Sequence, residues 1–161
     1  MATLRLILGL IFAAALSQFP AFSDQYVQRL GGQVDALTQV ATDFDASARR
    51  ARLTRDEALA ELSGSAFREA HSGDMRQVFV RLEKASNDLA LLRAASPLER
   101  IALPHRLRDV ETLRATWGDF RPALPVTQAG FIAAGLGLLI GWLLAGLLAA
   151  PFRRREQVSW R

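Results

Sequence analysis

The sequence predicts an all-α membrane protein in which two transmembrane helices, an antiparallel pair, flank a helical hairpin or bundle. Three observations lead to this fold class. Residues 122–152 contain no charged side chain, a second apolar stretch covers residues 6–22, and the segment between them repeats apolar residues at helical spacing. A bilayer core about 30 Å thick needs about 20 apolar helical residues, so the C-terminal stretch is long enough to cross it.

The distribution of charge predicts the orientation of the chain in the membrane. Residues 23–121 carry equal numbers of basic and acidic side chains, so the net charge of +4 lies at the two ends of the chain. Arg153, Arg154 and Arg155 follow the second span directly. Basic residues close to spans favour the cytoplasmic side, and they attract anionic lipid there. We therefore expect a multi-pass protein of the bacterial inner (cytoplasmic) membrane with both termini in the cytoplasm and no nucleic-acid partner.

These observations divide the chain into four regions. Residues 1–22 form an N-terminal transmembrane helix or signal anchor, and residues 23–121 form a periplasmic helical domain. Residues 122–152 form a C-terminal transmembrane helix with its lead-in, and residues 153–161 form a basic cytoplasmic tail. The chain has no cysteine, which is compatible with an oxidising periplasm.

The N-terminal apolar segment has a second interpretation. Ala15, Leu16 and Ser17 place small residues where a signal peptidase reads them, so cleavage before Gln18 remains open. An uncleaved span is favoured because the uncharged stretch continues to Ser23, which is about long enough to cross a bilayer. Cleavage would leave a periplasmic module with one C-terminal anchor.

Both apolar segments carry small residues at every fourth position. This spacing makes a smooth strip on a helix, and such strips let two membrane helices approach closely. The predicted strip residues are Gly9, Ala13, Ser17 and Ala21 in the first segment and Ala133, Gly137, Gly141, Ala145 and Ala149 in the second. Two such strips in one chain suggest that the spans pack on each other, although a second copy or a foreign subunit could also be the partner. The alternative is that glycine and alanine are simply common in membrane helices.

The segment between the spans shows two apolar seams at alternating spacings of three and four, which is typical of helical bundles and coiled coils. The first consists of Val27, Leu30, Val34, Leu37, Ala41, Phe44 and Ala48, and the second of Met75, Val78, Leu82, Ala85, Leu89 and Leu92. Helix starts are expected at Ser23 or Asp24, at the capping box that begins with Thr54, at Gly73 and at Ser96. Gly31 and Gly32 could mark a bend in the first helix or a close crossing.

Residues that could carry chemistry are few. The chain lacks the nucleophile elbow, the phosphate loop, the dinucleotide fingerprint and the HExxH zinc motif. His71 and Asp74 lie three residues apart and His105 lies elsewhere, whereas a zinc site needs three or four converging ligands. We therefore predict a non-enzymatic protein without a catalytic site, a metal or a cofactor.

Short motifs near both spans resemble a known family. The first motif lies between Ser17 and Gly32 and reads SQFPAF and then, after Ser23 and Asp24, QYVQRLGG. The second lies between Asp119 and Pro125 and reads DFRPALP. Together with the glycine-rich last span, they resemble the proteobacterial family catalogued as domain of unknown function 2937. The resemblance implies a bacterial inner-membrane protein of similar layout, and it implies no activity or active site.

Two classes of function fit these features. The first is an accessory, assembly or scaffold subunit that docks a protein partner or a second copy through its helices. The second is a periplasmic module that binds or senses a lipid, a cell-wall fragment or a protein. The nine residues from Arg153 to Arg161 are too short to form an output domain, so a sensor would also need a partner.

Overall fold

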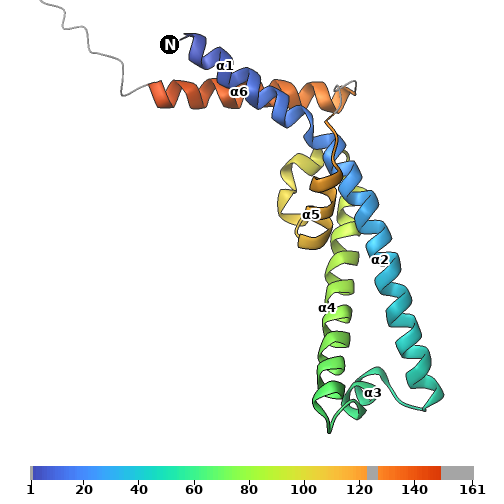
Figure 1. Cartoon of the computed structure of the whole chain (residues 1–161). Helices are drawn as coiled ribbons and strands as arrows, with labels where there is room; N and C mark the ends of the chain where they lie inside the picture. Colours follow the sequence, from blue (N-terminus) through green and yellow to red (C-terminus); the bar gives the residue numbers. More distant parts are fainter. Residues whose placement is uncertain (1, 123–126, 150–161) are drawn as a thin grey trace, which may run out of the picture. The chain divides into compact units, whose positions relative to one another are not determined.

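All regular structure that the computed structural model describes, in residues 2–122 and 127–149, is helical (Figure 1). The elements in chain order are α1 (Ala2–Ser17), α2 (Phe19–Arg50), α3 (Arg55–Glu61), α4 (Ala66–Ala94), the 3₁₀ helices η1 (Glu99–Ala102) and η2 (Pro104–Arg106), α5 (Val110–Asp119) and α6 (Gln128–Ala149). The predicted all-α fold class is therefore confirmed. Arg153, Arg154 and Arg155, which sequence analysis assigned to the cytoplasmic tail, lie outside the described residues.

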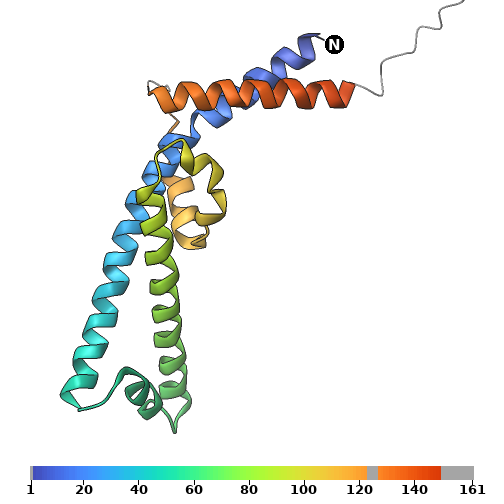
Figure 2. The ribbon, with the colours of Figure 1, turned by 180° about the vertical axis from the view of Figure 1, so that it is seen from behind.

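The chain forms two compact units. The first consists of Met1–Asp24, Pro97–Ala102 and Phe120–Arg161, and the second of Gln25–Ser96 and Leu103–Asp119. The first unit contains α1 and α6, and the second contains most of α2 together with α3, α4 and α5 (Figure 2).

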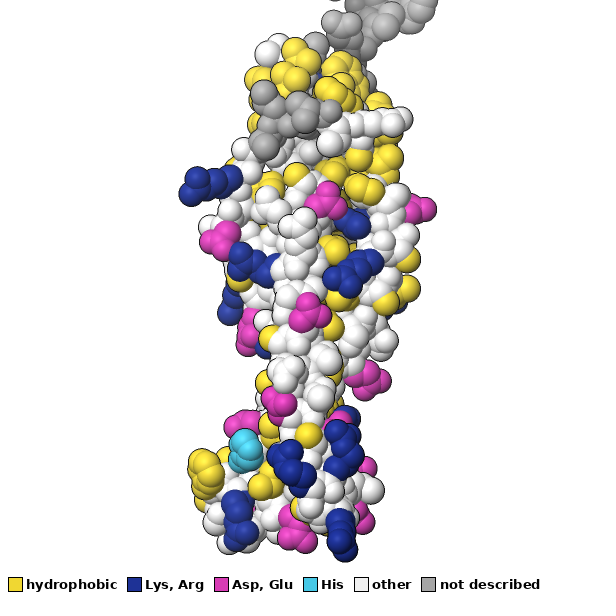
Figure 3. Space-filling model, turned by 90° about the vertical axis from the view of Figure 1, so that its right-hand side faces the viewer, with side chains coloured by type: hydrophobic (Ala, Val, Ile, Leu, Met, Phe, Trp, Pro, Cys, Tyr) yellow, Lys and Arg dark blue, Asp and Glu magenta, His cyan; other side chains and the backbone are white. Residues whose placement is uncertain are grey.

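Two helical stretches are long and apolar enough to cross a membrane. They are Thr3–Arg50, whose apolar window lies near the N-terminus, and Gln128–Leu148. Only 22% of each apolar window is buried, and Leu10, Ile11 and Leu147 are among the exposed side chains of these helices. On the face shown in Figure 3, hydrophobic side chains gather over α1 and α6, while basic and acidic side chains are interspersed over the second unit. Length, composition and exposure together indicate a membrane protein.

In the second unit, α2 and α4 run in opposite directions and are joined through α3. Thr54 caps α3 in the predicted capping box, where its hydroxyl accepts from the Glu57 N–H and the Glu57 carboxylate accepts from the Thr54 N–H. Burial follows both predicted seams. Buried are Val27, Leu30, Leu37, Ala41 and Ala48 on α2 and Met75, Ala85, Leu89 and Leu92 on α4. The remaining seam residues, Val34, Phe44, Val78 and Leu82, are partly buried. Phe44 of α2 meets Phe79 of α4 edge to face, with ring centroids 5.5 Å apart.

Several local expectations differ from the structure. Helix α2 begins at Phe19 and continues past Ser23, whose hydroxyl donates to the Pro20 carbonyl instead of capping a new helix. Helix α2 continues through Gly31. The guanidinium of Arg93 lies against the space where a side chain would be, so this glycine permits a close approach by α4. Helix α4 starts at Ala66 rather than Gly73, because the Ser65 hydroxyl accepts from the Arg68 N–H and supplies an earlier cap.

The segment after Ser96 also departs from expectation. Its proline and glutamate favoured an α-helix, but the structure has a four-residue 3₁₀ helix, Glu99–Ala102. Pro104 follows too closely for a longer helix, since a proline inside it would lack the N–H donor. In the first unit, Arg100 of this segment forms an ion pair with Asp24.

Candidate functional sites: the α1–α6 interface and a charged groove

The contact between α1 and α6 depends on glycines. A Cβ atom on Gly137 would lie 2.8 Å from the Cα of Ala13, and one on Gly141 would lie 2.7 Å from the Cα of Gly9. Real Cβ atoms essentially never come within 3.0 Å of another heavy atom, so any side chain at either position would force the backbones apart. Residue numbers fall along α1 as they rise along α6, and the pair is therefore antiparallel.

The other residues of the predicted strips whose side chains the structure describes lie in the same interface except Ala21; the side chain of Ala149 lies outside the described part. Ala133, Ala145 and Ser17 are buried, and Ala13 is partly buried. The Ser17 hydroxyl donates to the Ala14 carbonyl at 2.7 Å, so its polar group is satisfied within its own helix. Ala21 is exposed, because the chain leaves α1 at the one-residue break before Phe19. The described strips thus face each other within one chain.

Arg5 adds a contact that sequence analysis did not identify. A Cβ atom on Gly146 would lie 3.1 Å from an Nη atom of Arg5, so the guanidinium occupies the room that this glycine leaves. The guanidinium carbon also lies 5.9 Å from the ring centroid of Trp142, within the range of a cation–π interaction. The spacing of Trp142 and Gly146, four residues apart on one helix face, was the available signal.

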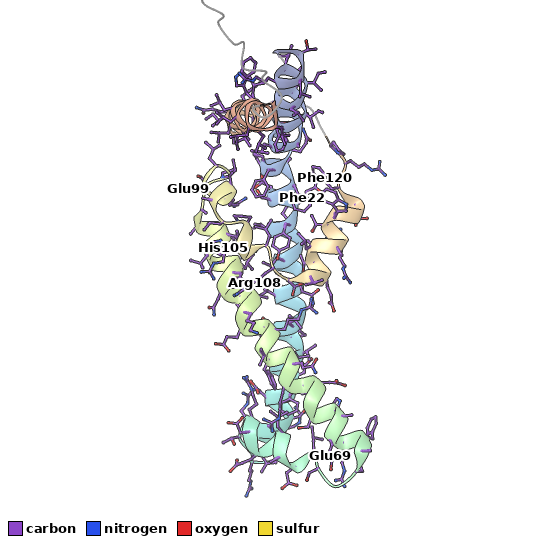
Figure 4. The ribbon with its side chains drawn as sticks, turned by 90° about the vertical axis from the view of Figure 1, so that its left-hand side faces the viewer. Phe22, Glu69, Glu99, His105, Arg108 and Phe120 are labelled. Carbon is purple, nitrogen blue, oxygen red and sulfur yellow. The ribbon has the colours of Figure 1, made fainter. Side chains whose placement is uncertain are left out.

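Aromatic packing completes the first unit. The rings of Phe22 and Phe120 lie edge to face with centroids 5.4 Å apart, as Figure 4 shows. Phe22 is the last residue of the apolar N-terminal segment, and Phe120 begins the stretch that leads from α5 toward α6. The contact therefore joins the two segments that connect to the apolar helices.

The second unit carries a groove of about 520 Å³ between α2, α4 and the segment before α5. Such a volume lies within the range of small-molecule sites, roughly 300–1,000 Å³. Helix α2 contributes Tyr26 and Leu30, and the segment before α5 contributes Arg108 and Asp109. The lining residues from α4 are Arg76, Gln77, Val80, Arg81, Lys84, Ala85 and Asp88.

Asp109 organises one side of this groove. Its carboxylate accepts two hydrogen bonds from Arg81, both 2.9 Å long, and a third from the Thr112 N–H, which caps α5. The Asp109 N–H in turn donates to the hydroxyl of Tyr26 at 3.2 Å. Burial raises the pKa of Asp109, but the hydrogen bonds from Arg81 and Thr112 outweigh it and hold that pKa below its ordinary value.

Asp88 organises the other side. Only 4% of its side chain is exposed, and it accepts hydrogen bonds from Arg108 at 2.6 and 3.1 Å and from Arg106 at 3.2 Å. Arg108 is labelled in Figure 4. These bonds fix the segment between η2 and α5 against α4, because a buried carboxylate without partners would be strongly destabilising.

Two cations of the groove have no such role. Arg76 and Lys84 are exposed, and neither has an ion-pair partner among the described residues. Sequence analysis missed this groove. The available signal was the spacing of Arg76, Val80 and Lys84, which places two cations on either side of an apolar residue along one helix face.

The histidines that sequence analysis considered do not converge. His71 stacks on the exposed ring of Phe67 with centroids 6.4 Å apart, and His105 lies in η2. Within residues 2–122 and 127–149, no group of three or more potential metal ligands comes together. His71 and Asp74 therefore contribute no cluster of that kind.

The fold and these contacts define a class: a small all-α membrane protein whose first and last helices pair through glycines and whose remaining helices form a separate charged unit. The chain belongs to the family DUF2937, described as a protein of unknown function, whose family model matches residues 1–157. Comparisons with the curated proteins and with the solved structures found no match.

Proposed function

We propose that this protein is a non-enzymatic accessory, assembly or scaffold subunit of the bacterial inner membrane. The observation that carries the proposal is the α1–α6 interface, in which Gly137 and Gly141 bring two helix backbones into direct contact. This contact joins the first and last helices of the chain into one membrane unit. The helices between them are then available to a partner protein or a second copy of the chain.

Exposed aromatic side chains at two places on the second unit supply contact points for that partner (Figure 1). Phe67 at the start of α4 is 81% exposed, and Trp117 of α5 is 74% exposed. Large aromatic residues are the side chains that most often dominate binding energy in protein interfaces. The buried or partly buried carboxylates Asp88 and Asp109, by contrast, are held by arginines as structural ion pairs. This division supports an interaction role rather than catalysis.

The proposal is tested by crosslinking in native membranes, followed by purification through a tag placed after Arg161. We expect the wild-type chain to carry one stoichiometric companion, and a differently tagged second copy shows whether that companion is the same protein. Replacing Phe67 and Trp117 with alanine should reduce the companion several-fold. The matched control replaces Val40 and Val110, which are exposed aliphatic residues of the same unit, and should retain it. A wild-type chain that runs alone contradicts the proposal.

The orientation is tested separately, and the chain is suited to this because it has no cysteine. Ser63→Cys and Ser159→Cys each introduce a single thiol. With the central domain in the periplasm and both termini in the cytoplasm, a membrane-impermeant maleimide should label Ser63→Cys in intact cells and Ser159→Cys only after lysis. The reverse pattern would overturn the proposed topology.

A further inference from the structure

The groove of the second unit combines an apolar floor with a charged rim. Leu30, Val80 and Ala85 line it together with the ring of Tyr26. Leu30 and Tyr26 are fully buried by their neighbours, and Val80 is 49% exposed. An apolar lining with a few placed polar groups is the usual composition of a small-molecule site.

The rim carries more positive than negative charge. Four cations, Arg76, Arg81, Lys84 and Arg108, face two carboxylates, Asp88 and Asp109. Arg81 pairs with Asp109, and Arg108 pairs with Asp88. The excess of two positive charges therefore belongs to Arg76 and Lys84, and an anion would balance it.

Arg76 and Lys84 are placed so that both can reach one anion. They are eight residues apart on α4, which puts their Cα atoms about 12 Å apart along the helix, with Val80 midway. Both side chains are long and carry several donors, so they can converge over Val80. This arrangement places the head of a ligand beside an apolar surface rather than in open water.

Tyr26 closes the groove from the α2 side. Its hydroxyl oxygen accepts from the Asp109 N–H. The side chain is fully buried, so its ring and hydroxyl lie beneath the surface that a ligand would touch.

We propose that this groove binds a single-chain anionic amphiphile, with its carboxylate or phosphate head at Arg76 and Lys84 and its hydrocarbon chain along Val80 and Ala85. This inference goes beyond the proposed interaction role. The apolar floor selects against a simple inorganic anion, and the surplus positive charge selects against a neutral or cationic lipid.

The test uses the full chain in zwitterionic phosphatidylcholine nanodiscs and a 12-carbon carboxylate that carries a photoreactive diazirine on its chain. After irradiation, we expect peptides from α4 between Arg76 and Asp88 to be labelled. Laurate and dodecyl phosphate should compete with the probe. Dodecanol, acetate and inorganic phosphate at the same concentration should not.

Variants test whether the cations hold the head. Replacing both Arg76 and Lys84 with glutamine should reduce labelling of the α4 peptide about tenfold or more, as expected when charge-assisted hydrogen bonds are lost. The matched control replaces Arg49 and Arg114, two exposed arginines without an ion-pair partner among the described residues, and should leave labelling unchanged.

Four results would overturn the inference. They are unchanged labelling in the Arg76 and Lys84 double variant, equal competition by dodecanol, equal competition by acetate or phosphate, and labelling confined to α1 and α6. The last would mean that the probe only partitions into the bilayer. None of these readouts depends on a protein partner, so the inference and the proposed function fail independently.

Discussion

The α1–α6 pair and the α2–α4 pair are both contacts between long antiparallel helices, but different types of residue form the two interfaces. In the first, glycine and alanine let the backbones touch, and the two helices form no ion pair within the described residues. In the second, the backbones stay apart, and buried leucines and an aromatic pair fill part of the space. Arginine–carboxylate bonds join α4 to the segment before α5. A groove of about 520 Å³ remains.

The difference shows how the surroundings select the means of packing. Hydrocarbon tails already satisfy an apolar side chain, so helices in a membrane gain mainly from close van der Waals contact. Helices in water gain from removing apolar surface, and polar side chains at the edge of the contact can be paired or left to solvent. Four changes test this contrast, in order of decreasing expected effect, with Trp142 of α6 and Trp117 of α5 as separate reporters.

Gly137→Leu should have the largest effect, because its side chain would collide with the backbone of α1. We expect a loss of about 3 kcal/mol of unfolding free energy, at the upper end for overpacked sites. The measurement is unfolding in mild detergent followed by Trp142 fluorescence in a chain with Trp117→Phe and Trp160→Phe. Gly135→Leu is the matched control, since a Cβ atom there meets nothing within 4 Å. Equal stability of the two variants would show that the glycine strip does not hold α6 against α1.

Asp88→Asn should destabilise the second unit by about 2 kcal/mol, because charge-assisted hydrogen bonds to Arg106 and Arg108 are weakened. The two arginines are partly exposed, so water offsets some of the loss. Trp117 fluorescence, in a chain with Trp142→Phe and Trp160→Phe, reports the change. Asp35→Asn removes an exposed carboxylate of α2 and serves as the control. If Asp88→Asn lowers the stability measured by Trp142 and not that measured by Trp117, the contrast between the two units is contradicted.

Acidification should lower the stability of the second unit more than that of the first. The pKa of Asp109 is lowered in the folded chain, so its contribution to stability is present above the ordinary carboxyl pKa of about 4 and is lost as the pH falls through the folded value. Neither α1 nor α6 contains a carboxylate. Between about pH 7 and pH 3, unfolding seen by Trp117 should shift to lower temperature more than unfolding seen by Trp142. Equal shifts of the two unfolding temperatures would contradict this expectation.

Arg5→Gln should have the smallest effect. It removes a cation–π contact with Trp142, which is worth about 0.5 kcal/mol at a site of this kind. The Nε atom of Arg5 is buried and has no hydrogen-bond partner in the described part of the chain, and removing it offsets part of the loss. A change in the emission maximum of Trp142 with little change in its unfolding midpoint is expected. A loss as large as that of Gly137→Leu would show that the interface depends on charge.

The sequence predicted the first contact better than the second. Small residues at every fourth position form a smooth strip on one helix face, so the packing residues Gly9, Gly137 and Gly141 could be predicted from spacing alone. The groove depends on Asp109 meeting Arg81 and Arg108 meeting Asp88, pairs far apart in the chain. Arginine and aspartate recur throughout this region, and no periodicity distinguishes these pairs from the rest. Gly73 as a helix start was wrong, because the cap at Ser65 outweighs the small cost of a glycine inside α4.

The antiparallel pairing of α1 with α6 also sets the order of assembly during synthesis. Gly141, which Gly9 meets, is synthesised 132 residues after it (141 − 9 = 132). At about 5–20 residues per second, roughly 7–26 s separate the two on the ribosome. During that interval α1 must stay in the bilayer without its partner, so its own hydrophobicity has to retain it there. The glycine interface can therefore close only after the helices of the second unit have been synthesised.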